Sequence, residues 1–481
     1  MRPAQENASS TVRNRLFTIL VGVVTACCLG LSFAFGQAEA TSGSNAKFVR
    51  FEDFLAATRD ANAGDYLARP TRRVKDAASF EEMRRHILTM YDGIEISHSF
   101  MLGASHFDCV PVMQQPSVRL LGIKTLASPP PPSMLAPAAE AGGDPSGLPV
   151  RPASQIDPDN PFDEFGNSVA CEANTIPMRR LTLDEMTRFE TLRQFFQKSP
   201  DEAGNVLAPT LIKPPIQLVR NPVATVAHKY SVALQNVNAL GGNSILNLWS
   251  PYVNTTKSEG FSLSQEWWVA GTFSGSDGQT AEVGWQNFPT KYGQGENSVL
   301  FNYWTADNYN NTGCYNLECA AFVQIAAQGT LGAKFSNYST LGGTQYEFSA
   351  EYRLYNGNWW LAIQGTWLGY YPGSLYSAKN TGELAKNATQ IQFGTESTGT
   401  TLWPPEGSGN WPSKGFGQAA YQRNLFYVDT SGNSQWDQLT TSSFTSTKCY
   451  NIAGPYSVGP SGAAPGWTVN IYDGGPGGSG C

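Results

Sequence analysis

The 481-residue chain has few of the residues on which most hydrolytic and metal sites depend. It contains four histidines: His86, His98 and His106 lie close together, and only His228 comes later. A Ser-His-Asp or Cys-His site needs an imidazole base, and zinc sites commonly use several His or Cys ligands. We interpret His228 as an ordinary polar residue. Carboxylates are therefore the main catalytic candidates, and no metal or other cofactor is expected.

Charged residues are also scarce, at 15% of the chain, and the net charge is −7 with no basic block. Nucleic acids and anionic membranes bind clustered lysine and arginine, so neither is an expected partner. Aromatic residues reach 12%, and the 48 glycines indicate many tight turns. The length allows two or three domains. We expect a monomer.

The N-terminus has the pattern of an export signal. Two arginines precede an apolar run from Leu16 to Phe35, and a small-x-small cleavage site ends at Ala40. Residues 1–40 are therefore predicted to be a signal peptide, which gives a secreted or periplasmic product without stable membrane association. An uncleaved anchor is the alternative, as is lipidation at Cys27.

Removal of the signal leaves six cysteines, an even number suited to disulfides in an oxidising compartment. Other connectivities are possible, but the simplest pairing by order is Cys109–Cys171, Cys314–Cys319 and Cys449–Cys481.

Residues 41–222 have partly helical patterns. Ser79-x-x-Glu82 reads as a capping box before an apolar stripe, and a second helix is predicted from Leu183 to Gln197. Residues 128–165 are rich in Pro, Ala and Gly, which predicts an extended linker. A second exposed connection, called the connector below, contains Pro209, Pro214, Pro215 and Pro222.

Residues 223–481 follow a period of two. Alternating residues 345–354 end at Asn356-Gly357, and a return strand begins at Trp359, which is a hairpin signal. Similar short strands are predicted at 263–270, 280–288, 299–305, 320–326, 390–396, 421–428 and 467–472. This pattern predicts an all-β domain, an antiparallel β-sandwich, preceded by a smaller partly helical segment.

Two of the predicted strands carry mirrored polar patterns. One reads Glu282-x-Gly-x-Gln286, and the other reads Gln392-x-Gly-x-Glu396. If these strands paired antiparallel in register, the two glutamates would face each other with Cβ atoms about 5 Å apart. Alternatively, both are ordinary glutamates on a solvated face, as most glutamates are.

Ten successive blocks from His228 to the C-terminus resemble the neprosin family of secreted glutamic peptidases. They include SLSQEWWVAG, AEVGWQNFP, YWTADNYNNTGCYNLECAAFVQ, IQFGTE and VNIYDGGPGGSGC. FDCVPVMQQPSVRL, around Cys109, resembles the activation peptide of that family. The resemblance implies a catalytic domain at 223–481 behind a prosegment at 41–222. It also implies a catalytic pair at Glu282 and Glu396, although QFGTE replaces the two glycines usual before the second glutamate in plant members.

The resemblance further implies an endopeptidase that cleaves on the carboxyl side of proline at acidic pH and is made as a zymogen. Two nearby glutamates share a proton, so one can activate water while the other protonates the departing nitrogen. Proline-containing peptides and proteins are the expected substrates. Candidate substrate-binding residues are Trp285, Gln286, Tyr292 and Gln392, and further aromatic candidates for a proline pocket are Trp304 and Tyr315.

A secreted carbohydrate-binding or carbohydrate-cleaving β-sandwich is the main alternative function. Aromatic platforms and a pair of glutamates suit glycoside hydrolysis equally well. A secreted structural protein with a vestigial site is a third possibility. The helical leader favours the peptidase, because a lectin or glycosidase rarely needs one.

Overall fold

The computed structural model describes residues 47–140, 142–143, 147–198, 227–271, 277–295, 297–377, 383–443, 447–457 and 467–481. The predicted signal peptide and the connector prolines lie outside these ranges. The chain from Asn45 to Cys481 is one compact unit. In the described ranges, no helix combines the length and the apolar character needed to cross a membrane.

The predicted fold class is confirmed: the chain is mostly antiparallel β with a large curled sheet, preceded by a partly helical region. The helices are α1 (Phe51–Asp60), α2 (Ala63–Leu67), α3 (Ala77–Tyr91), α4 (Pro116–Leu120), α5 (Leu183–Met186), α6 (Leu192–Phe196), α7 (Pro289–Tyr292) and α8 (Ser374–Ser377). A small N-terminal sheet contains β1 (Ser99–Leu102), β2 (Ser105–Pro111) and β5 (Thr175–Arg179).

Helix α3 begins earlier than the predicted capping box. The carboxylate of Asp76, not the Ser79 hydroxyl, caps it by accepting a 2.7 Å hydrogen bond from the Ser79 backbone N–H. The predicted apolar stripe is fully buried, and it consists of Phe80, Met83, Ile87 and Met90. Burial of this stripe anchors the helix to the core.

The single helix predicted from Leu183 to Gln197 is wrong. Thr182 forms a capping box for α5, and the Thr191 side chain accepts from the Gln194 N–H to cap the separate helix α6. The second cap restarts the helix in a new direction, because an N-cap residue has extended backbone geometry. The chain that leaves α6 then reaches the β-rich part.

The remaining strands belong to the β-rich part and the segment that docks on it. They are β3 (Gly142–Gly143), β4 (Pro149–Pro152), β6 (Ala227–Asn247), β7 (Glu259–Ala270), β8 (Gln279–Asn287), β9 (Val299–Thr305), β10 (Cys314–Tyr315), β11 (Val323–Gln324), β12 (Gln345–Tyr355), β13 (Asn358–Ile363), β14 (Thr366–Pro372), β15 (Ala388–Gly399), β16 (Leu402–Trp403), β17 (Ala420–Asp429), β18 (Ser434–Trp436), β19 (Thr440–Ser443), β20 (Asn451–Tyr456), β21 (Asn470–Gly474) and β22 (Gly478–Ser479). Every predicted strand segment overlaps one of them.

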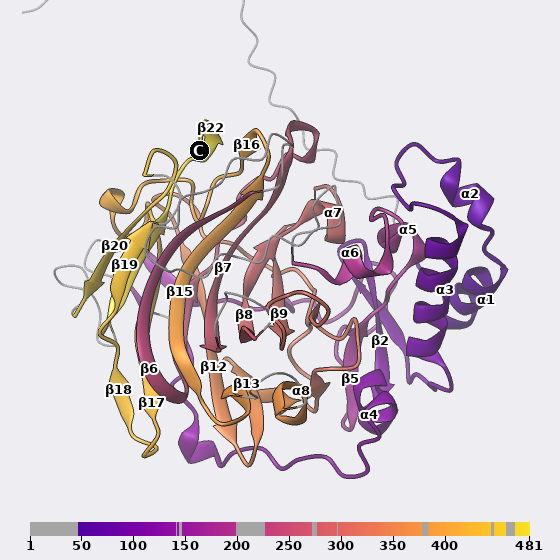
Figure 1. The fold of residues 1–481 in the computed structure, drawn as a ribbon, viewed down its shortest axis with the longest axis horizontal. Coiled ribbons are helices and arrows are strands. Elements are labelled where there is room, and N and C mark those ends of the chain that lie inside the picture. The colour runs from indigo at the N-terminus through magenta and orange to yellow at the C-terminus, as the bar shows by residue number, and fades with distance from the viewer. Residues whose placement is uncertain are drawn as a thin grey trace, which may run out of the picture. The chain divides into compact units, whose positions relative to one another are not determined.

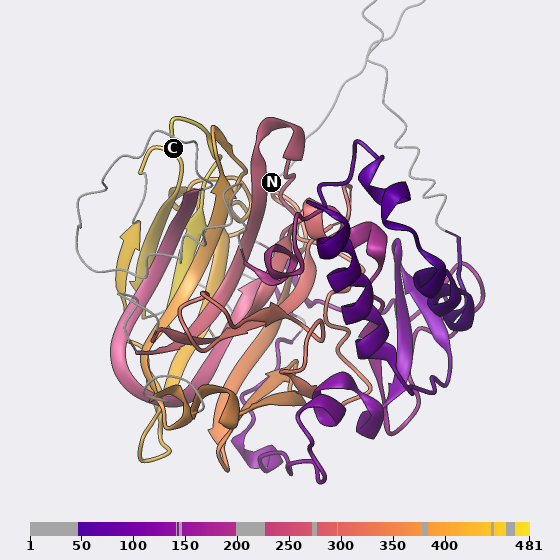
Figure 2. The same ribbon diagram turned by 45° about the vertical axis from the view of Figure 1, so that its right-hand side comes forward.

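The strands that matter for the site run in the order β6–β15–β7–β8–β9–β10, each antiparallel to the next. Figure 1 shows β6, β15 and β7 as long curved strands side by side. Figure 2 shows the same strands and the indigo N-terminal helices from a second direction. The curl makes one face of this sheet concave, so side chains from strands that are not direct neighbours can converge there.

Strand β6 changes partners halfway along its 21 residues, from β15 to β12. Gly241 lies at this change and has φ +121°, and a Cβ there would lie 2.0 Å from the Tyr352 carbonyl oxygen. Only glycine tolerates both this backbone conformation and so close an approach. The change lets β6 join two parts of the curled sheet.

The predicted hairpin and cysteine pairs are present. Asn356 and Gly357 have φ values of 48° and 74° and form the two-residue turn between β12 and β13. The disulfides follow chain order, as Cys109–Cys171, Cys314–Cys319 and Cys449–Cys481. Each bridge joins one cysteine to the next cysteine along the chain.

The Pro-rich segment lies against the sheet. Strand β4 pairs with the start of β12 in parallel, and the Ala136 N–H donates to Glu351 Oε2 at 2.7 Å. Pro149 and Pro152 bound β4. Proline has no N–H to donate, which suits such a short segment at the margin of a sheet.

Candidate active site

Glu282 and Glu396 lie on strands that flank β7. Glu282 on β8 is opposite Trp267, and Glu396 on β15 is opposite Leu263. Both strands are antiparallel to β7, so they run parallel to each other. The direct antiparallel pairing considered for the mirrored patterns does not occur, because β7 lies between the two strands. Both glutamates nevertheless occupy the same face of the sheet.

Gln265 on β7 connects the two halves of the mirrored pattern. It lies opposite Gly284 on one side and Gly394 on the other. Because neither neighbour has a side chain, the amide of Gln265 is free to reach along this face. Its Nε2 donates to Glu282 Oε2 at 2.9 Å.

Glu282 is fully buried and accepts two further hydrogen bonds on Oε1. Thr280 Oγ1 donates at 2.7 Å, and the Tyr309 hydroxyl donates at 2.6 Å. Tyr309 has a left-handed backbone, with φ 61°, and its N–H donates to Thr305 Oγ1. This turn after β9 directs the phenol back to the carboxylate. With Gln265, three neutral side chains donate hydrogen bonds to the carboxylate of Glu282.

Glu396 is also fully buried, and its Oε1 lies 2.5 Å from His228 Nδ1. His228 stands near the start of β6, two residues before Tyr230, the residue opposite Glu396. Our interpretation of His228 as an ordinary polar residue is therefore wrong. Nothing in its local sequence indicates this contact, because its partner is 168 residues away.

Lys198 bridges the two glutamates. Its Nζ lies 2.5 Å from Glu282 Oε2 and 2.9 Å from Glu396 Oε2, and its side chain is 2% exposed. The ammonium also lies 5.2 Å from the centre of the Trp267 ring, within cation–π range. Lys198 belongs to the N-terminal region and follows the end of α6 by two residues. One cation from outside the β-rich part thus occupies the space between both carboxylates.

The electrostatics of the cluster favour its ionised form. Burial lowers the pKa of Lys198, but the attraction of Glu282 and Glu396 outweighs burial and raises that pKa above its ordinary value. Burial raises the pKa of Glu396, but Lys198 and His228 outweigh burial and lower that pKa below its ordinary value. Buried charges of this kind are stable only while their partners stay in place.

Two of the predicted substrate-binding residues share the face of the glutamates. Gln286 Nε2 donates to the Tyr315 hydroxyl at 3.2 Å, and that hydroxyl lies 3.4 Å from the Lys198 carbonyl oxygen. Gln392 on β15 is opposite Trp267, level with Glu282. The structure therefore brings Gln286, Gln392 and the aromatic candidate Tyr315 towards the glutamates.

The other predicted binding residues lie elsewhere. Trp285 and Trp304 alternate with the site residues, so they occupy the opposite face, where the Trp285 indole donates to the Asn247 carbonyl at 3.0 Å. Tyr292 in α7 is 5% exposed and packs under the Arg179 guanidinium, 5.2 Å from its ring centre. None of these three side chains touches the glutamates in the contacts described above.

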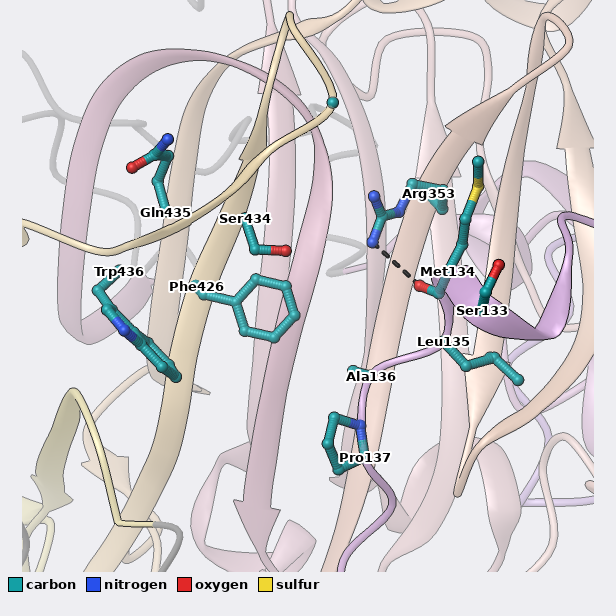
Figure 3. Close-up of a pocket in the computed structure, with 11 residues that line it drawn as sticks. Ser133, Met134, Leu135, Ala136, Pro137, Arg353, Phe426, Ser434, Gln435 and Trp436 are labelled. Atoms are coloured by element: carbon teal, nitrogen blue, oxygen red, sulfur yellow. Dashed lines mark hydrogen bonds between the residues drawn. The ribbon is translucent and has the colours of Figure 1, made fainter.

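A separate cleft of about 370 Å³ lies between the Pro-rich segment and the β17–β18 hairpin. Figure 3 shows Trp436 and Phe426 on one side of it and Met134 on the other, where the Met134 carbonyl accepts from Arg353 at 3.2 Å. Among the described residues that line this cleft, none carries a carboxylate. It does not contain the glutamate pair.

One group of possible metal ligands occurs in the described ranges, formed by His98, Cys109 and Glu172. Cys109 is already bonded to Cys171, so it has no thiolate to offer. This group therefore offers a metal ion fewer ligand atoms than its three residues suggest.

Comparison with known families places the glutamates in a recognised domain. Residues 258–476 match the family model named Neprosin. The matched range includes Glu282 and Glu396 but neither Lys198 nor His228. The cation that fills the site therefore comes from outside the matched domain.

Proposed function

We propose that this chain, whose residues 258–476 match the Neprosin family model, is a peptidase of that family and acts as a secreted glutamic endopeptidase. It hydrolyses peptide bonds on the carboxyl side of proline at acidic pH, with Glu282 and Glu396 as the catalytic pair. It is made as a zymogen, with residues 41–222 as its prosegment.

The main support for this proposal is that two fully buried glutamates contact the same ammonium. Amide hydrolysis needs a base that deprotonates water and an acid that protonates the leaving nitrogen. Once the ammonium leaves, water can enter its place between the carboxylates. Two buried carboxylates without a cation cannot both stay ionised easily, so they retain one proton between them. That arrangement supplies both the base and the acid.

Lys198 explains how the zymogen is kept inactive. Its ammonium occupies the position where the attacking water would be activated, and it holds both carboxylates in ion pairs. A glutamate paired with a buried cation is a poor proton donor, because its ionised form is strongly favoured. The same residue therefore excludes water from the pair and removes the acid that the reaction needs.

The pKa shifts indicate that acid releases this restraint. The pKa of Glu396 is lowered while Lys198 and His228 face it, with the Glu282 carboxylate on the other side of the ammonium. A group with a lowered pKa stabilises the docked state above its ordinary pKa of 4.5, and this stabilisation is lost as the pH falls through the lowered value. Docking of the prosegment is therefore weakest in acid, where the enzyme is proposed to work.

Mass-spectrometric mapping of cleavage sites on a mixed peptide library tests the proposal. The full-length protein is incubated with the library at acidic and at neutral pH, and a parallel sample receives polysaccharides. We expect cuts after proline, more abundant at acidic pH, and no release of sugars. Cuts without a preference for proline would contradict the specificity. Sugar release without peptide cleavage would instead favour the glycosidase.

A further inference from the structure

The segment that carries Lys198 to the glutamates makes three hydrogen bonds through its main chain. The carbonyl oxygens of Phe195 and Phe196 accept from Lys291 Nζ at 2.9 Å and from the Tyr303 hydroxyl at 3.3 Å. The Lys198 carbonyl accepts from the Tyr315 hydroxyl at 3.4 Å. The three hydrogen bonds use only main-chain carbonyls, so another peptide backbone could replace them, although the Lys291 ammonium also lies 3.6 Å from the centre of the Phe195 ring.

The two tyrosine donors form a row that leads away from the catalytic pair. Tyr303 on β9 is directly opposite Glu282 on β8, and Tyr315 on β10 is directly opposite Tyr303. Residues directly opposite in antiparallel strands share one face. The row therefore crosses three neighbouring strands on the face of the glutamates, and its two tyrosines donate to the carbonyls of Phe196 and Lys198.

The donors are arranged for a ligand with carbonyl groups. Gln286 donates to the Tyr315 oxygen at 3.2 Å, which leaves the hydroxyl proton of Tyr315 to point at the carbonyl of Lys198. Lys291 is fully buried and also pairs with Glu318 at 2.8 Å, which fixes its ammonium in place. Departure of the segment would leave buried donors without acceptors, a state that costs free energy until another carbonyl arrives.

We propose that Lys291, Tyr303 and Tyr315 are main-chain-binding subsites for the part of a substrate that precedes the scissile bond. This inference rests on the proposed peptidase function. The prosegment runs from Phe195 towards the catalytic pair, and Lys198 is where it reaches the pair. A substrate bound in the same direction places the residues before its scissile bond on these three donors.

The proposal defines the class of substrate more closely. The enzyme binds extended chains with several residues before the cleaved bond, and it reads their backbone rather than their side chains at those positions. Specificity for proline then depends on groups at the catalytic pair, not on this row. Short peptides that begin at or just before the proline should be poor substrates.

Substrate-length kinetics with Tyr303→Phe and Tyr315→Phe test this assignment. Quenched fluorescent peptides carry either one or four residues before the proline, and a second pair varies the length after the cleaved bond. The acid-activated full-length protein should show a higher kcat/KM for the peptide with the longer N-terminal side. Each phenylalanine variant should reduce that gain about two- to tenfold, the usual range for one neutral hydrogen bond, without reducing the gain from C-terminal extension.

Tyr252→Phe is the matched control, because Tyr252 is 65% exposed and lies outside the row. It should leave both gains unchanged, and hydrogen exchange of β12 and β13 should show that all three variants are folded. If both site variants cleave peptides and keep the full gain in kcat/KM from N-terminal extension, the assignment of the subsites is wrong but the proposed function stands. If the variants instead lose the gain in kcat/KM from C-terminal extension, the proposed direction of substrate binding is wrong. Failure of the wild type to cleave any peptide would contradict the proposed function itself.

Discussion

Replacement of Lys198 by methionine removes the buried ammonium and keeps an unbranched side chain of similar length. Two fully buried carboxylates then lose their shared partner, which lies 2.5 and 2.9 Å from them. Removal of one partner from a buried ion pair costs about 3–5 kcal/mol. The expected result is a prosegment that undocks far more readily.

This cost translates into a measurable gain of activity. Because about 1.4 kcal/mol corresponds to a tenfold change in an equilibrium, the undocked fraction should rise by roughly two to three and a half orders of magnitude. The assay is hydrolysis of a proline-containing quenched peptide by the uncut full-length variant at the highest pH at which the mature enzyme is active, with a gel at each time point to confirm that the chain is intact. Salt should change the result little, since a buried pair is poorly screened.

Lys75→Met is the control for this experiment, because Lys75 belongs to the same region but has an exposed side chain. It should remain as inactive as the wild type. A double variant, Lys198→Met with Glu282→Gln, should show a smaller loss of docking by hydrogen exchange, since one of the two uncompensated charges is gone. If uncut Lys198→Met stays as inactive as Lys75→Met, Lys198 does not hold the enzyme latent.

Three further predictions concern processing, inhibition and the pH dependence of stability. Acidification of the purified full-length protein should produce new N-termini just after connector prolines, detected by N-terminal sequencing; an enzyme that is fully active while uncut would contradict removal of the prosegment. The activity should have a bell-shaped acidic optimum and resist chelators, fluorophosphonates and thiol alkylators, whereas strong inhibition by a chelator would refute the mechanism. Burial raises the pKa of both Glu266 and Glu406 to about 8, so the folded state retains protons that the unfolded chain has lost, and the free energy of unfolding should fall as the pH rises from 4.5 to 8. Thermal unfolding at several pH values checks this, and Glu266→Gln should flatten the slope.

Local patterns predicted local structure well. The alternation before Asn356-Gly357 gave the hairpin, because a two-residue turn and its flanking strands are encoded in adjacent residues. The prediction of a single helix from Leu183 to Gln197 was wrong. The helical spacing of apolar residues continues across Thr191, but Thr191 caps a separate helix. Side-chain periodicity alone therefore does not reveal that the helix is interrupted there.

The proposed catalytic pair was chosen from the sequence, but the contacts around it could not be predicted. The resemblance to family motifs implied Glu282 and Glu396, and the structure shows that β7 lies between their strands. Lys198 is 84 residues from Glu282, and the contact depends on how the chain leaves α6. No local pattern encodes a partner at that separation. His228 was misread for the same reason, since its role exists only once β6 and β15 have paired.

The most direct test of the central claim compares three glutamine variants in the peptide-cleavage assay at acidic pH. Glu282→Gln and Glu396→Gln keep the shape of each side chain but remove its titration. Glu406→Gln is the matched control, because Glu406 is equally buried, is held by Thr395 and Ser397 on either side of Glu396, and keeps its proton in acid. All three proteins should fold. We expect the first two to lose essentially all activity and self-processing while Glu406→Gln retains both, and substantial activity in either folded catalytic variant would contradict the glutamate pair.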